Sequence, residues 1–250
     1  MLLDVAFDPA GAGRWRNTVT VLVDVLRATS SLVTLFERGC SGVIPVGSLA
    51  AARRLARSHG YSLAGERNGL TPAGFRWNNS PAELAQADFA GEEVVLTTTN
   101  GTAALRWLRN APGVLAGSLL NGPACAARAL AVAGEQGGDV GIACAGRGRR
   151  FALDDALCAG YLVEMALRAA PHELKTTDAA RAARQLWLGN REDVAGAFRL
   201  SASGQRLAEI GLEADVLFCA RMGVSEAVPE LRRGLPDRFV RAERVTNGPT

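Results

Sequence analysis

The sequence is poor in histidine and lacks paired cysteines, and both absences narrow the chemistry available to it. Only His59 and His172 occur among the 250 residues, so neither a histidine base nor a multi-histidine metal site is expected. The five cysteines are odd in number, widely spaced and without a Cys-x-x-Cys pair. This pattern argues against a disulfide framework or a zinc site and indicates reduced thiols in a cytoplasmic protein. Carboxylates, hydroxyls, arginines or a thiol must therefore carry any catalysis.

Long apolar runs and concentrated charge are missing as well. No apolar run approaches the roughly 20 residues of a membrane helix, and the N-terminal stretch MLLDVAFDPAGAGRW, with an acid at Asp4, is not a signal peptide. The 28 basic and 25 acidic residues are spread through the chain, without the basic stripe of a nucleic-acid-binding protein. The expected partner is a small molecule, with no nucleic acid and no membrane, and a homodimer is left open.

What the sequence does contain is an alternation of strand and helix patterns. TVTVLVDVL is a β-branched run typical of a strand buried on both faces, and the amphipathic segment after it ends at Gly39. Further pairs of this kind predict an α/β fold, a three-layer α/β/α sandwich with a largely parallel or mixed sheet. We expect a single α/β domain over residues 1–250, with 241–250 as a loosely ordered tail. The Arg-, Pro- and Gly-rich stretch from Pro229 onward is expected to wrap the surface.

Polar residues directly after the predicted strands are the first candidates for a site, because ligands of such sheets bind outside the carboxyl ends of the strands. Asp24 ends the first β-branched run, and Arg27 follows it. A carboxylate in so apolar a run must be paired, metal-bound or used as a helix cap. The stretch VVLTTTNGTAAL passes from a strand into a helix-forming segment. Asn100, Gly101 and Thr102 would there direct N–H groups and hydroxyls at one place, which suits an anion.

More acids and amides stand in a long irregular segment of about twenty residues, YSLAGERNGLTPAGFRWNNSPAEL. Structureless loops of that length are usually functional. This one contains Glu66, Arg67, Asn79 and Ser80. Asn121 follows a later short strand, where a helix cap is the simpler interpretation. Each fragment alone is weak evidence, since Asn and Gly are common in turns for conformational reasons.

Two adjacent acids follow the strand-like run DVGIACAG and its Gly-rich loop. Asp154 and Asp155 open a helix, where acids are common because of the helix dipole. With Asp24 and Glu66 they also make enough hard oxygen ligands for Mg²⁺, which uses one or two carboxylates together with phosphate oxygens of a substrate.

These motifs resemble those of a known family. VDVLRATSS, GERNGLTPAGFRWNNSP, LTTTNGTAAL, LLNGPA and ACAGRGRRFALDDALCAG stand in the order and approximate spacing of the 2-phosphosulfolactate phosphatases, enzymes first associated with coenzyme M biosynthesis. The resemblance implies an α/β/α fold of the family's own type, a requirement for Mg²⁺, and hydrolysis of 2-phosphosulfolactate to sulfolactate and phosphate. Carried over by position, the implied site comprises Asp24, Arg27, Glu66, Arg67, Asn79, Ser80, Asn100, Gly101, Thr102, Asn121, Gly146, Asp154 and Asp155.

The family usually has Glu-Asp where this chain has Asp154 and Asp155, so one side chain is shorter here. In the preferred hypothesis Asp24, Glu66 and Asp155 hold Mg²⁺, which polarises the phosphate. Arginines 27 and 67 would clamp the anionic groups of the substrate. A metal-activated water is the simplest attacking group, and an aspartate nucleophile is the other option.

Two different readings stay open at this point. Cys144 and Arg150 have the Cys-x5-Arg spacing of thiol phosphatases, and a thiolate of lowered pKa attacks phosphorus without a metal. Alternatively, the same pocket would serve a non-catalytic sensor that binds a phosphorylated or sulfonated metabolite.

Overall fold

A computed structural model describes residues 1–148 and 150–243 of the chain. Its described strands join in one ten-stranded sheet. In chain order they are β1 (Leu2–Ala6), β2 (Thr18–Val23), β3 (Gly42–Pro45), β4 (Ser62–Gly65), β5 (Glu93–Thr97), β6 (Val114–Gly117), β7 (Asp139–Cys144), β8 (Lys175–Thr176), β9 (Pro229–Arg232) and β10 (Arg238–Arg241).

The helices range from single turns to a long buried helix, α7. They are α1 (Pro9–Ala12), α2 (Ala28–Glu37), α3 (Leu49–His59), α4 (Pro81–Leu84), α5 (Gly101–Ala104), α6 (Gly122–Glu135), α7 (Leu153–Ala169), α8 (Asp178–Asn190), α9 (Val194–Leu200), α10 (Ala202–Glu209) and α11 (Glu213–Cys219). None of the helices in the described part of the chain is long and apolar enough to cross a membrane.

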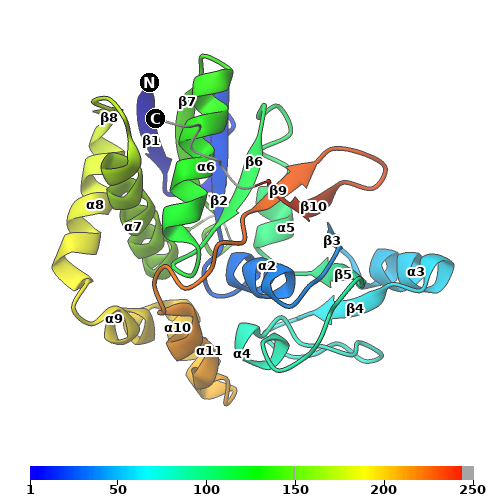
Figure 1. Cartoon of the computed structure of the whole chain (residues 1–250). Helices are drawn as coiled ribbons and strands as arrows, with labels where there is room; N and C mark the ends of the chain where they lie inside the picture. The colour runs from blue at the N-terminus through cyan, green and yellow to red at the C-terminus, as the bar shows by residue number, and fades with distance from the viewer. Residues whose placement is uncertain (149, 244–250) are drawn as a thin grey trace.

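The sheet consists of two parallel parts with an antiparallel hairpin between them. Its strand order is β4-β5-β3-β10-β9-β6-β2-β7-β1-β8. Strands β4, β5 and β3 are parallel, as are β6, β2, β7, β1 and β8. The hairpin β9–β10 meets its neighbours through the pairs Phe239 with Val43 and Leu115 with Glu230. Figure 1 shows this hairpin in orange and red between β6 and β3.

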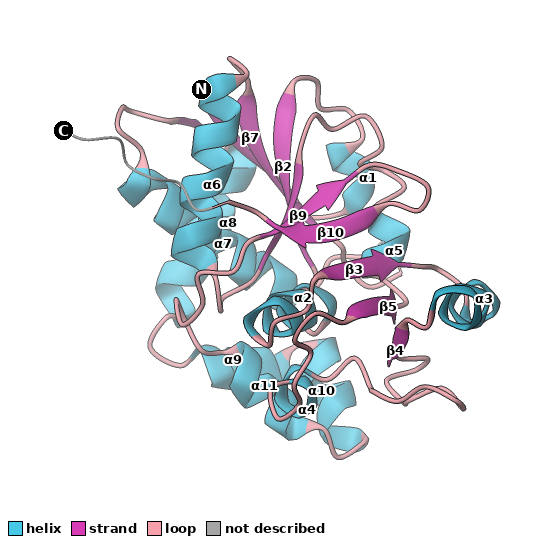
Figure 2. Cartoon of the chain, turned by 45° about the vertical axis from the view of Figure 1, so that its right-hand side comes forward, coloured by secondary structure: helices cyan, strands magenta, loops and turns pink. Residues whose placement is uncertain are grey.

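Helices cover both faces of this sheet, as Figures 1 and 2 show. Along β2, Val21 packs in a cluster with residues of α6, α7 and α8, whereas Leu22 packs in a second cluster with residues of α2 and α5. The β-branched run is therefore buried on both sides, because alternate side chains of a strand point to opposite faces. The predicted three-layer α/β/α sandwich with a mixed sheet is confirmed.

Two local expectations differ from the structure. The stretch from Pro229 does not wrap the surface, since it forms β9 and β10 and buries Leu231 and Phe239 in the core. Arg241, expected to start a loosely ordered tail, is part of β10, and residues 244–250 of that expected tail lie outside the described residues. The assignment of residues 1–250 to a single domain stays a prediction.

Candidate active site

A cleft of about 670 Å³ is lined by residues that follow β2, β4, β5 and β7, together with residues of α10. Five of the predicted site residues line it, namely Asp24, Arg27, Glu66, Asn79 and Asn100. Segments far apart in the sequence therefore meet outside the carboxyl ends of the strands, as the parallel arrangement requires.

Asp24 is the most perturbed acid among those that line the cleft. Its burial raises the pKa of the carboxyl from its usual value to about 7, and the nearby carboxylates of Asp154 and Glu66 add to this rise. Hydrogen bonds from the backbone at Ala28 and Gly101 oppose it. Gly101 allows the close approach, because a Cβ there would lie 3.0 Å from Oδ2 of Asp24. The carboxylate thus carries a negative charge that its surroundings compensate only in part.

The two acids at the start of α7 have different surroundings. Asp155 accepts the N–H of Val25 at 3.0 Å and that of Gly146 at 2.9 Å, so it joins the loops after β2 and β7 behind the cleft. Asp154 lines an adjoining cavity that shares Arg147 with the cleft, and its Oδ1 is buried without a hydrogen bond. Burial raises the pKa of both carboxyls. Asp154 is therefore the acid of this pair with an oxygen free to bind a ligand.

Glu66, directly after β4, braces the loops at the mouth of the cleft. Its Oε1 accepts the N–H of Thr99 at 2.8 Å and the hydroxyl of Thr99 at 2.7 Å, and its Oε2 accepts the N–H of Gly69 at 2.9 Å. The side chain thus links the turn after β5 to the loop after β4, and both of its oxygens already have protein donors.

The turn after β5 is occupied largely by groups of the protein itself. The expected helix is a single turn, α5, and the N–H of Thr102 donates to Oγ1 of Thr98 at 3.3 Å. The hydroxyl of Thr102 donates to the carbonyl of Thr98 at 2.7 Å. With Asp24 beside Gly101 and Glu66 on Thr99, the negative groups that this junction binds are two of the chain's own carboxylates. Its role as a cradle for phosphate stays a prediction.

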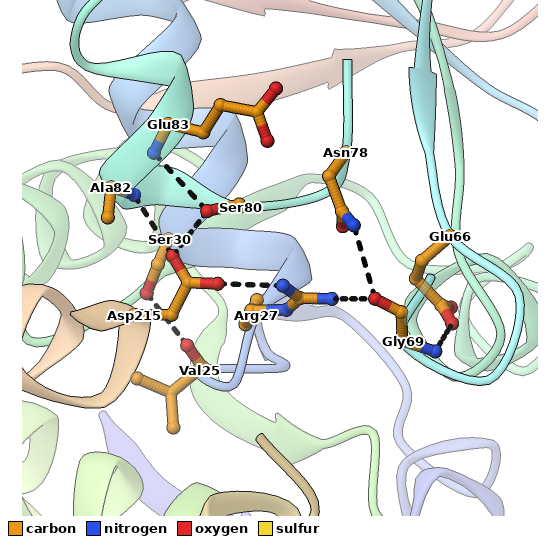
Figure 3. Close-up of polar contacts among 10 residues, drawn as sticks. All are labelled: Val25, Arg27, Ser30, Glu66, Gly69, Asn78, Ser80, Ala82, Glu83 and Asp215. Carbon is orange, nitrogen blue, oxygen red and sulfur yellow. Dashed lines mark hydrogen bonds and ion pairs between the residues drawn. The ribbon is translucent and has the colours of Figure 1, made fainter. Parts of the chain in front are cut away.

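Arg27 enters the cleft from a buried network that Figure 3 displays. Its Nη1 donates to Oδ2 of Asp215 at 2.7 Å, and its Nη2 donates to the carbonyl of Gly69 at 3.3 Å. The other oxygen of Asp215 accepts the hydroxyl of Ser80 at 2.6 Å and the N–H of Ala82 at 3.1 Å. Ser80, expected to touch substrate, is thus committed to Asp215 and to the cap of α4.

Neither Arg67 nor Asn121 lines the cleft. Arg67 donates to the carbonyl of Gly47 at 2.8 Å and is not among the lining residues. Asn121 is fully buried, and its amide donates to the carbonyls of Ala116 and Ala227 at 3.1 and 2.9 Å. Asn121 thus holds the loop after β6 together and has a structural role.

Several residues that line or support the cleft were not expected from the sequence. Arg147, Ser203 and Arg206 line it, and Asp215 holds Arg27. Arg147 closely follows β7, and this position at a strand end is the sequence signal that could have identified it. Asp215 stands in the apolar stretch ADVLF, where an isolated acid needs a partner. Ser203 and Arg206 carry no comparable signal, because only tertiary packing brings α10 to the strand ends.

The residues at this edge of the sheet fit a hard divalent cation. No Lys, Arg or His within residues 1–148 and 150–243 forms an ion pair with Asp24, Asp154 or Asp155, and Oδ1 of Asp154 has no hydrogen bond. The same ranges contain no cluster of three or more acidic, His or Cys side chains that forms a metal site by itself. Magnesium does not require one, because it typically uses one or two carboxylates and keeps water or phosphate oxygens.

The environment of Cys144 disfavours thiol chemistry. The side chain is fully buried, and burial together with the negative charge of Asp155 raises the pKa of the thiol well above its usual value. A nucleophilic cysteine needs the opposite, a lowered pKa and access to solvent. We therefore expect Cys144→Ala to keep the rate of phosphate release within about three-fold of the unchanged protein, as for a small packing change. Loss of activity in a folded variant, or rapid inactivation by iodoacetamide with protection by phosphate, would restore the thiol mechanism.

Comparison with known proteins agrees with the resemblance drawn from the motifs. The model of the 2-phosphosulpholactate phosphatase family matches residues 9–234. A probable 2-phosphosulfolactate phosphatase of Clostridium acetobutylicum is 33% identical over 234 residues, covering 93% of this chain and 97% of the relative. Proteins of the same description from Deinococcus radiodurans and Pseudothermotoga lettingae are 40% and 35% identical, covering 86% and 96% of this chain and 88% and 99% of theirs. The chain belongs to the 2-phosphosulfolactate phosphatase family.

Proposed function

We propose that this protein is a Mg²⁺-dependent phosphatase that hydrolyses 2-phosphosulfolactate, the phosphate monoester of a small anionic hydroxy acid, to sulfolactate and phosphate. The reaction class, hydrolysis of a phosphoric monoester, follows from the family and from the relatives described as 2-phosphosulfolactate phosphatases. The observation that supports the metal requirement is the pair of buried carboxylates, Asp24 and Asp154. The negative charge of Asp154 helps to raise the pKa of Asp24, Oδ1 of Asp154 has no hydrogen bond, and neither acid forms an ion pair within residues 1–148 and 150–243.

The charge of the cleft matches such a substrate. A molecule with phosphate, sulfonate and carboxylate groups carries about four negative charges near neutral pH. Arg27, Arg147 and Arg206 line the cleft, and guanidinium groups bind phosphate and carboxylate with paired hydrogen bonds. The sequence predicted Arg27 and Arg67 as the clamp for the anionic groups. Arg67 is not in this set, because its guanidinium donates to the backbone carbonyls of Glu66 and Gly47.

Asp24 and Asp154 are the side chains that would hold Mg²⁺, because Asp24 lines the cleft and Oδ1 of Asp154 has no hydrogen bond. Both carboxylate oxygens of Asp155 and of Glu66 accept hydrogen bonds from the protein. Bound to Asp24 and Asp154, the cation would polarise the phosphate ester and offset charge on its oxygens. The protein itself supplies the orientation: Arg27 is fixed by Asp215, and the loops at the mouth are fixed by Glu66. The attacking group is either a water molecule or one of the two aspartates.

The test is phosphate release from a panel of phosphorylated two- and three-carbon acids that includes 2-phosphosulfolactate, each run with Mg²⁺ and with EDTA. We expect 2-phosphosulfolactate to be the best substrate and EDTA to lower the rate by at least about 100-fold, the scale of losing a metal that stabilises transition-state charge. Release that is unaffected by EDTA contradicts the metal requirement. Binding of substrate without any single-turnover release of phosphate would identify a sensor instead.

A further inference from the structure

We propose that Asp215 of α11 is a positioning residue for Arg27, holding the guanidinium at the angle at which it meets an anion in the cleft. The proposal rests on the proposed function only in naming phosphate as that anion. Asp215 itself is absent from the lining of the cleft, and Arg27 is the lining residue to which it is hydrogen-bonded, so the effect on the ligand is indirect.

Hydrogen bonds hold both terminal nitrogens of the Arg27 guanidinium. Nη1 of Arg27 donates to Oδ2 of Asp215 at 2.7 Å, and Nη2 donates to the carbonyl of Gly69 at 3.3 Å. The same carbonyl accepts a hydrogen bond from Nδ2 of Asn78 at 3.2 Å, and Figure 3 shows the two donors converging on Gly69. Gly69 in turn donates its N–H to Glu66. The direction of the arginine is thus set by groups from α11 and from the loop after β4.

Asp215 is itself fully satisfied. Its Oδ1 accepts the hydroxyl of Ser80 at 2.6 Å and the N–H of Ala82 at 3.1 Å, and the side chains of Asp215 and Arg27 are only 1% and 3% exposed. Burying an ion pair is expensive unless every lone pair and N–H finds a partner. Both oxygens of Asp215 are bonded and both terminal nitrogens of the Arg27 guanidinium have protein acceptors, so the pair is held in one geometry.

The charge arrangement gives the pair a use beyond stability. Within the described ranges Asp215 is the one acid that forms an ion pair with Arg27. The remaining N–H groups of the guanidinium, which carries five in a rigid plane, stay available to an anion that enters the cleft. A fixed donor needs no reorganisation when the anion binds, which is how preorganised groups improve binding and catalysis.

The experiment is a double-mutant cycle on the full chain, with the Kd of inorganic phosphate measured by calorimetry. Asp215→Asn should weaken phosphate binding about ten-fold, because the amide cannot accept from Arg27 and Ser80 together. In an Arg27→Met background the same substitution should change the Kd by less than about two-fold, since nothing remains to be positioned. An equal loss in both backgrounds, or an unchanged Kd in folded Asp215→Asn, would overturn the proposal.

Glu164→Gln is the matched control, because it also removes the charge of a buried carboxylate that forms ion pairs with arginine. Glu164 lies on α7, outside the lining of the cleft, and its partners are Arg168 and Arg184. Its phosphate Kd should stay unchanged. If Asp215→Asn does not fold, Asp215→Glu keeps the charge and displaces the guanidinium by one methylene group. Folded Asp215→Glu should then bind phosphate at least about five-fold more weakly, and an unchanged Kd would refute the positioning role. Because phosphate binding is measured without turnover, an absence of hydrolysis counts against the proposed function alone.

Discussion

Asp24→Asn should abolish phosphate release while making the metal-free protein more stable above neutral pH. The variant removes one of the two carboxylates proposed to hold Mg²⁺ and one of the aspartates that could attack phosphorus, so we expect kcat to fall by at least about 1,000-fold. Near-native turnover in Asp24→Asn would remove this residue from the mechanism. The gain in stability is the less usual half of the prediction, and its sign follows from the raised pKa.

Burial raises the pKa of Asp24 to about 7 in the folded protein, from a usual value of 3.8. Between these values the folded state binds more protons than the unfolded state, so the free energy of unfolding falls as pH rises from about 4 to about 7. The upper limit of this loss is about 4 kcal/mol, at about 1.4 kcal/mol for each unit of pKa. Asparagine carries no charge at any pH and avoids the loss.

The measurement is urea unfolding in EDTA at about pH 5 and about pH 8 for both proteins. We expect similar stabilities at the lower pH and a more stable Asp24→Asn at the higher pH. Added Mg²⁺ should stabilise the unchanged protein at the higher pH and have little effect on the variant, because a ligand stabilises the state that binds it. Parallel pH profiles of the two proteins would contradict the assignment of Asp24 as a buried, uncompensated acid.

Gly65→Ala should damage both the stability of the protein and the site. Gly65 ends β4 with φ +154°, and a Cβ there would overlap the carbonyl oxygen of Thr97 on the neighbouring strand. That oxygen accepts the N–H of Glu66 at 2.9 Å. The clash therefore acts on the residue that braces the mouth of the cleft. We expect a loss of about 3 kcal/mol in the free energy of unfolding, from the overlap and the strained backbone together.

The same variant should lower kcat/KM by about 100-fold, because displacing a bracing group by an ångström misaligns the cleft. Gly60→Ala is the control, since Gly60 has φ +73° and nothing lies within 4 Å of a Cβ placed there. The free energy of unfolding of Gly60→Ala should fall by only about 1 kcal/mol, the cost of placing alanine in the left-handed backbone conformation, and its activity should be unchanged. Equal effects of the two substitutions would show that glycine at residue 65 serves backbone freedom alone.

Much of the fold follows from local pattern. The β-branched run forms β2, and the amphipathic segment after it forms α2 and ends just before Gly39, as the sequence predicts, because periodicity and stop signals are properties of neighbouring residues. The hairpin β9–β10 escapes such reasoning. Its short strands lie in an Arg- and Pro-rich stretch, and what makes them strands is the pairing with β3 and β6, residues that are distant in the chain.

The site divides in a similar way. The rule that ligands bind beyond the carboxyl ends of parallel strands groups Asp24, Glu66 and Asn100 correctly at one cleft. It cannot tell which oxygen of an acid is already bonded. Asp155, expected to hold the metal, is bonded to the protein, whereas Asp154 has the oxygen without a hydrogen bond. Arg206 and Asp215 come from helices after the last parallel strand, and their approach depends on side-chain packing that no local pattern encodes.

The central position of the β9–β10 hairpin has a consequence for how the enzyme is assembled on the ribosome. Asp24 follows a strand of one parallel part of the sheet, and Glu66 follows a strand of the other. The β9–β10 hairpin, which joins these two parts, is translated after both. The two parts can acquire their own strands and helices early, since chains fold progressively as they emerge. We expect the cleft to be complete only after α10, which supplies Arg206, and the hairpin have been translated.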